Sequence, residues 1–386
     1  MRTWLEVNFD QLEKNLNTVR EVLPENCKII AVVKANAYGH GYEPVTRKLY
    51  ELGLRHFAVA CMDEAMQLRR AWISGDIIVL GSTEPQDARM AAENNITLAA
   101  VSPENLEALA AAAEGSPLPL KVHLAINTGM NRIGFDCKTE EQLQAIANAY
   151  RKYNGPSGHP IRITGIFSHF SSADDTSEGA DPYTKLQLSR YEKVLAYLAQ
   201  NNIAPGLRHI SNSGGIGKYP QARFDAVRCG ALIYGYNTAM DAKLSVQPAM
   251  QWKTAVTVVR TIDEGDAVSY SRKFIAKGPR TIATVGIGYA DGLSRQLSNR
   301  GYVLINGMRA PMIGNICMDQ MMVDVTEIQL QAAAGRTNAV VPGTEVVIIG
   351  RSGNLVQTAD NIAEIQRSCM HEVLSTIGQR VERYYK

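Results

Sequence analysis

The chain has 386 residues, of which 45% are hydrophobic and 20% are charged, and its formal net charge is +2. These values are typical of a globular protein with a hydrophobic core, built as one long barrel or as two domains. The sequence holds no cluster of Lys and Arg and no apolar run of the roughly 18–20 residues that a bilayer crossing needs. We therefore expect neither a nucleic-acid partner nor a membrane segment in this chain.

The six cysteines show no paired spacing, which predicts buried free thiols in a reducing compartment rather than a disulfide framework or a metal site. They are Cys27, Cys61, Cys137, Cys229, Cys317 and Cys369. Glu6 and Asp10 interrupt the start of the chain before any apolar segment, which argues against a signal peptide. The expected location is cytoplasmic, although a domain cut from a longer, membrane-anchored parent protein would show the same pattern.

From about residue 10 to about residue 240, short apolar runs alternate with longer amphipathic segments, which predicts parallel strands covered by helices. Eight such runs favour a closed (β/α)8 TIM barrel over an open doubly wound sheet. The runs are Lys28–Lys34, Phe57–Cys61, Ile77–Gly81, Ile96–Val101, Lys121–Asn127, Ile163–His169, Arg208–Asn212 and Phe224–Tyr234. The helical segments between them include Asp10–Leu23, Glu84–Asn94, Pro103–Glu114, Thr139–Tyr153 and Thr184–Asn201, and Ser102 is the expected N-cap of the third.

After about residue 240 the pattern changes to alternating segments separated by turn residues. Examples of the segments are Thr254–Ile262, Thr281–Ile287 and Tyr302–Ile305, and Asn306-Gly307 is one of the turns. Helical periodicity returns only near Thr358–Gly378. This second part of the chain is predicted to be a mostly β domain.

Lys34 ends the first apolar run, at the end of the strand where the active site of a (β/α)8 barrel lies. Partial burial at such a position lowers the pKa of a lysine and makes its amine a nucleophile toward an aldehyde. From its position alone, a lysine that only extends its amine into solvent is the more common outcome.

Later strand ends carry groups of complementary chemistry. Arg132 follows the fifth run in a turn that contains glycine, His169 ends the sixth, and Ser213 opens a Ser-Gly-Gly sequence after the seventh. Hydroxyl and backbone N–H groups of that kind can bind a phosphate, and Arg228 and Gly230 lie in the eighth unit. Taken singly, each residue has a structural explanation. Together at one face of a barrel, an amine, two cations and a phosphate loop indicate a site for a phosphorylated aldehyde.

The run Ala31–Gly41 (AVVKANAYGHG) resembles the cofactor-lysine motif of the alanine racemase family, whose members are pyridoxal-phosphate enzymes of fold type III. The resemblance extends over nearly the whole chain. It includes TGMNRIG (128–134), SHF (168–170), SNSGG (211–215), VRCGALIYG (227–235), VSYSR (268–272), GYADG (288–292) and PMIGNICMDQ (311–320). Agreement at so many positions in one order is far more specific than any single motif.

The resemblance implies a barrel domain over residues 9–240 and a β domain formed by residues 1–8 and 241–386. It also implies a homodimer in which the β domain completes the partner subunit's active site. Lys34 would bind pyridoxal 5'-phosphate covalently. The other cofactor-binding residues would be Tyr38, His169, Ser213, Arg228, Gly230 and Ala231, and the substrate-binding residues would be Arg132, Met318, Asp319 and His371.

The implied reaction is the interconversion of L- and D-alanine, which supplies a D-amino acid for peptidoglycan biosynthesis. Inversion at Cα needs one base on each face, and the resemblance assigns Lys34 to the proton of the D-enantiomer and Tyr270 to that of the L-enantiomer. Outside its VSYSR context, Tyr270 would be taken for a strand tyrosine with a hydrogen-bonded hydroxyl. Because arginine keeps its proton, Arg228 at the pyridine nitrogen would leave the cofactor a weaker electron sink and disfavour transamination.

Four positions differ from the usual pattern of the family. Ala125 stands where many members have a lysine that is often carbamylated and then carries a negative charge. Asn127 replaces an aspartate, Asn315 an arginine, and His371 a tyrosine of the last helix. The first two changes remove potential anions beside Arg132. They lead to the hypothesis that the site accepts a more polar side chain, with serine the leading candidate, as in serine racemases of the vancomycin-resistance type. Neutral variation beside the site is the opposing explanation.

Two other classes of protein share parts of this pattern. Barrel-type pyridoxal-phosphate decarboxylases of basic amino acids place a carboxylate at the ring nitrogen, which Arg228 argues against. A non-catalytic pyridoxal-phosphate homeostasis protein would share the barrel and its lysine but would lack the β domain. Residues 245–386 weigh against that alternative.

Overall fold

The computed structural model describes residues 2–154, 159–238 and 244–386, and the chain divides into two compact units. The first, called here the barrel unit, contains Leu12–Ala37 and Tyr42–Gln247. The second, the β unit, contains Met1–Gln11, Tyr38–Gly41 and Pro248–Lys386. The predicted domain boundary between residues 240 and 241 lies outside the described residues, as does the first residue of the chain.

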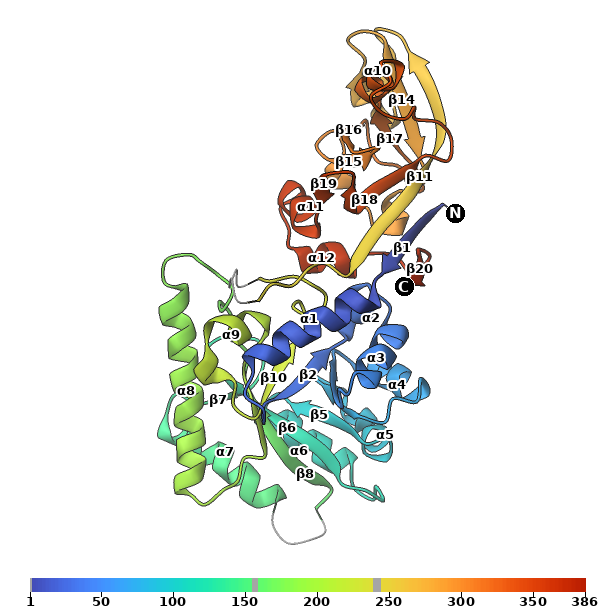
Figure 1. The fold of residues 1–386 in the computed structure, drawn as a ribbon. Helices are drawn as coiled ribbons and strands as arrows, with labels where there is room; N and C mark the ends of the chain where they lie inside the picture. The colour runs from blue at the N-terminus through green and yellow to red at the C-terminus, as the bar shows by residue number, and fades with distance from the viewer. Residues whose placement is uncertain (1, 155–158, 239–243) are drawn as a thin grey trace. The chain divides into compact units, whose positions relative to one another are not determined.

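Eight parallel strands form a closed ring in the barrel unit (Figure 1). They pair in the order β2-β3-β4-β5-β6-β8-β9-β10, and β10 pairs with β2 to close the ring. The strands are β2 (Lys28–Val32), β3 (His56–Val59), β4 (Asp76–Val79), β5 (Ile96–Ala100), β6 (Leu120–Asn127), β8 (Ile161–Phe167), β9 (Leu207–His209) and β10 (Ala226–Cys229). Each lies within or beside one of the eight apolar runs, so the prediction of a (β/α)8 barrel is confirmed.

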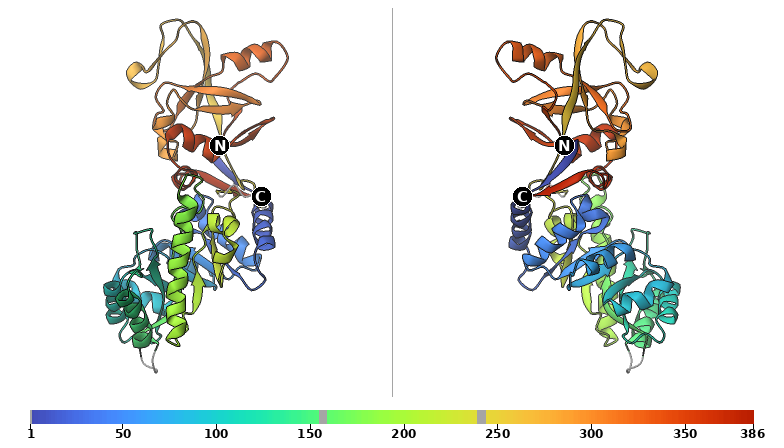
Figure 2. Two further views of the ribbon diagram at one scale, coloured as in Figure 1. Left: turned by 90° about the vertical axis from the view of Figure 1, so that its left-hand side faces the viewer. Right: turned by 90° about the vertical axis from the view of Figure 1, so that its right-hand side faces the viewer.

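Helices cover the outside of this ring, and the longest, α8, is clearly visible along it in Figure 2. They are α1 (Phe9–Val22), α3 (Tyr42–Glu51), α4 (Met62–Arg70), α5 (Ala88–Glu93), α6 (Pro103–Ala112), α7 (Glu140–Tyr153), α8 (Ala180–Gln200) and the short α9 (Ser213–Lys218). Ser102 caps α6 as expected, because its side chain accepts a hydrogen bond from the N–H of Asn105 at 3.1 Å.

Burial explains why these segments take this form. All five residues of β5 are buried, as expected for a strand that contacts the barrel interior on one face and helices on the other. In α1 the buried residues Leu12, Leu16 and Val19 are spaced by four and three positions, which places them on one face. Full burial of each such side chain contributes about 1.5–3 kcal/mol to folding.

The β unit contains a second closed ring, of six antiparallel strands in the order β11-β14-β17-β16-β15-β18 (Figure 1). These are β11 (Met250–Ile262), β14 (Arg280–Val285), β17 (Met321–Asp324), β16 (Met308–Ile313), β15 (Tyr302–Ile305) and β18 (Glu345–Ser352). Strand β1 (Thr3–Val7) pairs with β11, and β20 (Glu382–Tyr385) pairs with β1. The predicted mostly β second domain is thus confirmed.

Three helices complete the β unit: α10 (Thr326–Ala333), α11 (Ala359–Gln366) and α12 (Met370–Ser375). The helical segment predicted at Thr358–Gly378 is therefore two helices. The reason is Arg367, whose left-handed backbone (φ 56°) ends α11. Across the described ranges, no helix combines the length and the apolar character that a bilayer span requires.

All six cysteines are free thiols. Cys137 and Cys229 are buried, as the sequence predicted, and Cys27 and Cys317 are partly buried. Cys61 and Cys369 are exposed, so the expectation of burial is wrong for these two. The reason is their place in the fold, because each is the N-cap residue of a helix at the protein surface.

Candidate active site

Lys34 follows β2 and begins α2 (Lys34–Tyr38), which is a single left-handed turn. Ala35, Asn36 and Ala37 have φ between 52° and 55° and ψ between 44° and 53°. For residues other than glycine this conformation costs about 1–2 kcal/mol each. Such strain is concentrated at functional sites, and here it lies directly after the lysine that the sequence singles out.

The Lys34 amine lies among cations. Burial is the main cause that lowers its pKa, Arg132 and Arg228 lower it further, and Glu64 acts in the opposite direction. A lowered pKa increases the fraction of neutral amine near neutral pH, the form that reacts with an aldehyde or accepts a proton from carbon.

Arg228 is 2% exposed and is held by two histidines. Its Nη1 donates to Nδ1 of His209 at 2.8 Å, and Nε2 of His209 lies 3.0 Å from Nδ1 of His123. Its Nη2 donates to Nδ1 of His169 at 2.9 Å and to the carbonyl oxygen of Ser168 at 2.7 Å. This chain of contacts fixes the plane of the guanidinium group inside the barrel.

The tautomers of these histidines follow from the donor. Arginine only donates hydrogen bonds, so Nδ1 of His209 accepts, and its Nε2–H donates to His123. Burial is the main cause that lowers the pKa of His123 to about 4 and the pKa of His209 well below its ordinary value. Burial also lowers the pKa of Arg228, to about 10. Near neutral pH both histidines are therefore neutral and Arg228 is charged.

One nitrogen of Arg228 is available to a ligand. The bonds of its guanidinium group come from Nη1 and Nη2, and in the described part of the chain Nε has no acceptor. The neighbouring His169 is neutral as well, because burial and the charges of Arg228, Arg132 and Lys34 lower its pKa well below the usual value. A ligand here would meet a fixed N–H donor and an uncharged imidazole ring.

Ser213 and the turn after β10 lie together. The Ser213 hydroxyl oxygen accepts hydrogen bonds from the N–H groups of Gly230 at 3.3 Å and Leu232 at 3.5 Å, and Ala231 lies between these two residues. Asn212 caps α9 by accepting a bond from the N–H of Gly215 at 3.0 Å. The structure thus brings Ser213, Gly230 and Ala231 to one place, with a hydroxyl and backbone N–H groups that suit a phosphate.

Arg132 lies in the loop after β6, beside a small cavity of about 20 Å³. Ala125, Phe167 and His169 are among the residues that line the cavity. Asn127, at the end of β6, is engaged elsewhere: its Nδ2 donates to Oδ1 of Asp136 at 2.9 Å. An aspartate at position 127, as in the family pattern, could not donate this bond to Asp136. The asparagine therefore has a structural role in this chain.

The remaining predicted site residues belong to the β unit. Tyr270 is 69% exposed and lies in a strained turn in which Ser269, Ser271 and Arg272 have positive φ. Nδ2 of Asn315, another departure from the family pattern, donates to the carbonyl oxygen of Tyr270 at 2.8 Å.

An open pocket of about 520 Å³ brings Tyr270 together with Met318 and Asp319. His371, in α12, lies with its ring centroid 5.6 Å from that of Tyr38. Of the residues that the structure describes, no three His, Cys, Asp or Glu side chains gather as a metal site would require.

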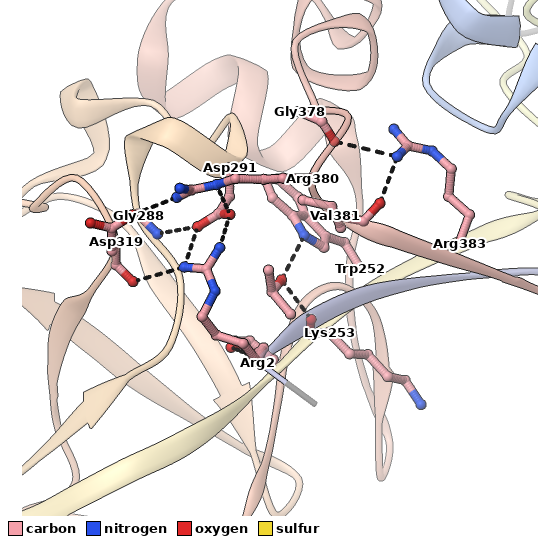
Figure 3. Close-up of polar contacts among 12 residues, drawn as sticks. Arg2, Trp252, Lys253, Gly288, Asp291, Asp319, Gly378, Arg380, Val381 and Arg383 are labelled. Atoms are coloured by element: carbon pink, nitrogen blue, oxygen red, sulfur yellow. Dashed lines mark hydrogen bonds and ion pairs between the residues drawn. The ribbon is translucent and has the colours of Figure 1, made fainter.

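A buried carboxylate holds the segment that contains Met318 and Asp319 (Figure 3). Asp291 is fully buried and accepts hydrogen bonds from the N–H of Gly288 at 2.9 Å, from Nε of Arg380 at 2.7 Å and from both terminal nitrogens of Arg2. The same two arginines bind Asp319, since Nη2 of Arg380 donates to its Oδ1 at 2.7 Å and Nη1 of Arg2 to its carbonyl at 3.2 Å.

The backbone of the turn that contains Asp291 continues this support. The N–H groups of Tyr289 and Ala290 donate to the carbonyl oxygens of Cys317 and Met318, both at 3.0 Å. A side chain at Gly288 would lie 2.3 Å from both carbonyl oxygens, so only glycine allows this approach.

Sequence reasoning did not single out His209, His123, Glu64 or Asp291. Asp291 lies in the matched GYADG motif, and this was the one feature of the sequence that could have identified it as a functional residue. The two histidines lie in predicted strands, where nothing local shows that they reach Arg228.

Comparison with known proteins points to a single family. Residues 7–238 match the model of "Alanine racemase, N-terminal domain" and residues 249–385 that of "Alanine racemase, C-terminal domain". The alanine racemase of Clostridium novyi (strain NT) is 38% identical over 385 residues, which cover 99% of this chain and 95% of that protein.

Solved structures of alanine racemases are similar to this chain as well. The alanine racemase from Bacillus anthracis with bound L-Ala-P has a TM-score of 0.89 at 32% identity and covers 100% of this chain and 95% of that one. The alanine racemase from Bartonella henselae with covalently bound pyridoxal phosphate has a TM-score of 0.86 at 27% identity, with 100% of both chains covered.

Proposed function

Since this chain belongs to the alanine racemase family, we propose that it interconverts L- and D-alanine with pyridoxal 5'-phosphate as its cofactor. The observation that carries the proposal is Lys34, an amine of lowered pKa at the end of a barrel strand, placed before a strained turn and among cations. The relatives are named alanine racemases, and one solved neighbour holds the cofactor covalently.

The residues of the barrel unit fit this cofactor. Ser213, with the N–H groups of Gly230 and Ala231, suits the phosphate. By the family pattern, the hydroxyl of Tyr38 would serve the phosphate as well. Nε of Arg228 would face the ring nitrogen, and the neutral ring of His169 would pack against the pyridine. When bound, pyridoxal 5'-phosphate withdraws electrons from Cα of the amino acid that it holds and so acidifies the Cα–H bond.

Two bases on opposite faces of Cα would then produce inversion. Nζ of Lys34 would take the proton from D-alanine, and Oη of Tyr270 would take the proton from L-alanine, with each returning a proton in the reverse direction. Arg132 would bind the substrate carboxylate, to which its planar guanidinium group is suited. Arg228 does not release its proton to the ring nitrogen, which favours reprotonation at Cα over transamination.

We further propose that the active chain is a homodimer in which Tyr270, Met318 and Asp319 reach the partner subunit's Lys34. The exposure of Tyr270 supports this, since a catalytic phenol works in a site from which water is excluded. The predicted domains, residues 9–240 and residues 1–8 with 241–386, would then divide the cofactor site from the residues that complete it.

The serine alternative is not favoured. The relatives reported above are alanine racemases, and two of the four departures have partners inside this chain: Asn127 binds Asp136, and Asn315 binds the backbone of Tyr270. A homeostasis protein without a second domain does not explain the match over residues 249–385. The proposed role is to supply D-alanine for peptidoglycan, and the free thiols suit the reducing cytoplasm.

The direct test is a racemisation assay with added pyridoxal 5'-phosphate, in which the loss of optical rotation of L-alanine and L-serine is followed. We expect a higher kcat/KM for alanine and no activity in Lys34→Ala. A higher value for serine would overturn the substrate assignment, and the absence of racemisation with either would overturn the function.

A further inference from the structure

The left-handed turn after Lys34 is held by a carboxylate from a neighbouring helix. Glu64 lies in the first turn of α4, and each of its oxygens accepts one backbone hydrogen bond: Oε1 from the N–H of Ala35 at 2.6 Å and Oε2 from the N–H of Ala60 at 2.7 Å. Ala35 follows Lys34, and Ala60 follows β3. One side chain therefore joins two neighbouring strand ends.

Glu64 acts where the pairing of β2 with β3 ends. The two strands pair in parallel up to Val32 and Ala58, and the N–H of Val33 still reaches the carbonyl of Ala58 at 2.9 Å. Beyond that point the chain turns left-handed, and the N–H of Ala35 bonds to Glu64 instead of to a strand. Hydrogen bonds to a charged acceptor are about twice as strong as neutral ones.

This bond orients the peptide unit between Lys34 and Ala35. Because that unit is planar, fixing its N–H sets the ψ angle of Lys34 and hence the direction in which the lysine side chain leaves the backbone. The rest of the turn is held by the bond from Ala37 N–H to the Val33 carbonyl at 2.9 Å and by the Asn36 side chain. Glu64 thus holds the peptide unit on the C-terminal side of Lys34.

We propose that Glu64 is a positioning residue for Lys34, whose carboxylate clamp holds the strained turn so that the Lys34 amine is aimed for reaction with the cofactor aldehyde. The inference rests on the proposed function, which supplies that aldehyde. In the reaction a C=N bond replaces the aldehyde C=O bond, and the oxygen leaves as water with the two protons of the neutral amine. Glu64 acts through the backbone and touches neither cofactor nor substrate.

Loss of the Glu64 charge and loss of its hydrogen bonds should change the rate at which Lys34 reacts with the aldehyde in opposite directions. Glu64 raises the pKa of Lys34, against the larger effect of burial. Glu64→Gln therefore lowers that pKa and increases the fraction of neutral amine, which by itself speeds reaction with an aldehyde. Loss of the clamp slows the reaction, because glutamine has one acceptor oxygen and turns an NH₂ group toward the second N–H.

The test is the rate at which apo-protein takes up pyridoxal 5'-phosphate, followed by the visible absorbance of the lysine-bound cofactor. We expect Glu64→Gln to slow uptake about 10-fold or more, since small displacements of a reacting group have effects of this size. Glu64→Asp keeps the charge with a shorter reach and should fall between this variant and the unaltered protein. Asp63→Asn, which removes the adjacent exposed acid of α4, is the matched control and should not change the rate.

Equilibrium binding of pyridoxine 5'-phosphate gives the second readout. This analogue has no aldehyde, so its affinity reports only phosphate and ring contacts, and we expect it to be equal in all variants. Uptake by both Glu64 variants at or above the unaltered rate would overturn the proposal, and so would a parallel loss of analogue affinity, which marks a general disruption of the site. Failure of the unaltered protein to take up cofactor on Lys34 would instead contradict the proposed function, and with it this role of Glu64.

Discussion

At the scale of single residues, His123 and Gly165 show how the barrel interior makes room for the buried contacts of His123, His209 and Arg228. The two residues pair across β6 and β8, and a Cβ atom at Gly165 would lie 2.6 Å from atoms of the His123 ring. Glycine is therefore required here by the space that the imidazole occupies, which in turn allows His123 to reach His209.

Gly165→Ala should lower the free energy of unfolding by about 1–3 kcal/mol, the usual cost of overpacking. The measurement is urea unfolding of the single variant and of the double variant with His123→Ala. Removal of the ring makes room for the new methyl group, so the cost of Gly165→Ala should largely disappear in the His123→Ala background. Equal costs in both backgrounds would show that the ring is not what excludes the methyl group.

The buried histidines also predict a pH dependence of stability. His123 and His209 have pKa values in the fold that burial lowers below the value near 6.5 of an unfolded chain. The unfolded state then binds more protons as the pH falls, so the stability contribution is complete above about pH 6.5 and is lost toward the folded pKa of His123, about 4. Each histidine contributes a slope of up to about 1.4 kcal/mol per pH unit in that window.

Urea unfolding at several pH values would measure this slope. His123→Asn should reduce it, whereas His159→Asn, which changes an exposed histidine, should leave it unchanged. An identical slope in His123→Asn and the unaltered protein would contradict the assignment of a neutral, buried His123.

How much of the site could be predicted at this scale depends on whether the signal is local. Lys34 lies in a specific motif at a strand end, so its neighbours in sequence identify it. The side chains that hold the site, such as Glu64 and His209, come from other elements. No spacing along the chain shows which backbone N–H or guanidinium group they will meet.

At the scale of elements, the turn that contains Asp291 fixes the segment Cys317–Asp319 (Figure 3). The Asp291 carboxylate is fully buried, while the side chains of Arg2 and Arg380 that bind it are 39% and 41% exposed. These contacts join Arg2 at the start of the chain and Arg380, just before β20, to the loop that contains Met318 and Asp319.

Asp291→Asn should therefore affect both stability and substrate binding. Breaking a buried ion pair typically costs about 3–5 kcal/mol, and the partial exposure of the two arginines favours the lower end. KM for alanine should rise, while uptake of pyridoxal 5'-phosphate should not change, because the proposed cofactor residues other than Tyr38 lie in the barrel unit. Glu43→Gln, which breaks the exposed pair with Arg47, is the control and should cost less than about 1 kcal/mol. An unchanged KM for alanine would show that the contacts of Asp291 do not influence substrate binding.

The elements themselves were largely predictable because their signals are periodic. Each of the eight apolar runs overlaps one of the eight barrel strands, since a parallel strand buried on both faces has a continuous apolar sequence. The division of Thr358–Gly378 into two helices was missed, because a left-handed arginine at position 367 is set by packing rather than by local propensity. The closure of the six-stranded ring could not be predicted either, because it depends on the long-range pairing of β11 with β18.

At the scale of the whole molecule, the predicted site residues are divided between the two units. Lys34, Arg132, His169, Ser213 and Arg228 belong to the barrel unit, and Tyr270, Met318 and Asp319 to the β unit. The proposed homodimer would bring one set from each protomer together, as a symmetric dimer with shared sites does.

Mixing two inactive variants tests this arrangement. Lys34→Ala and Tyr270→Phe should each have at most about 1% of the unaltered activity alone as homodimers. Unfolded together and refolded in equal amounts, they should regain about a quarter of the unaltered activity, because about half of the dimers are mixed and one of their two sites is intact. No recovery, with dimers present by size-exclusion chromatography, would place both residues of each site in one protomer.

Exchange of the Cα proton in D₂O is the sharpest test of the proposal that Lys34 and Tyr270 serve opposite faces of Cα. Each enantiomer of alanine is followed by proton NMR in the presence of Tyr270→Phe and pyridoxal 5'-phosphate. We predict that D-alanine still exchanges its Cα proton, that L-alanine does not, and that interconversion falls by about 10²–10⁴-fold, the usual contribution of a general acid or base. Exchange of both enantiomers together with inversion at the unaltered rate would show that Tyr270 is not the base for L-alanine.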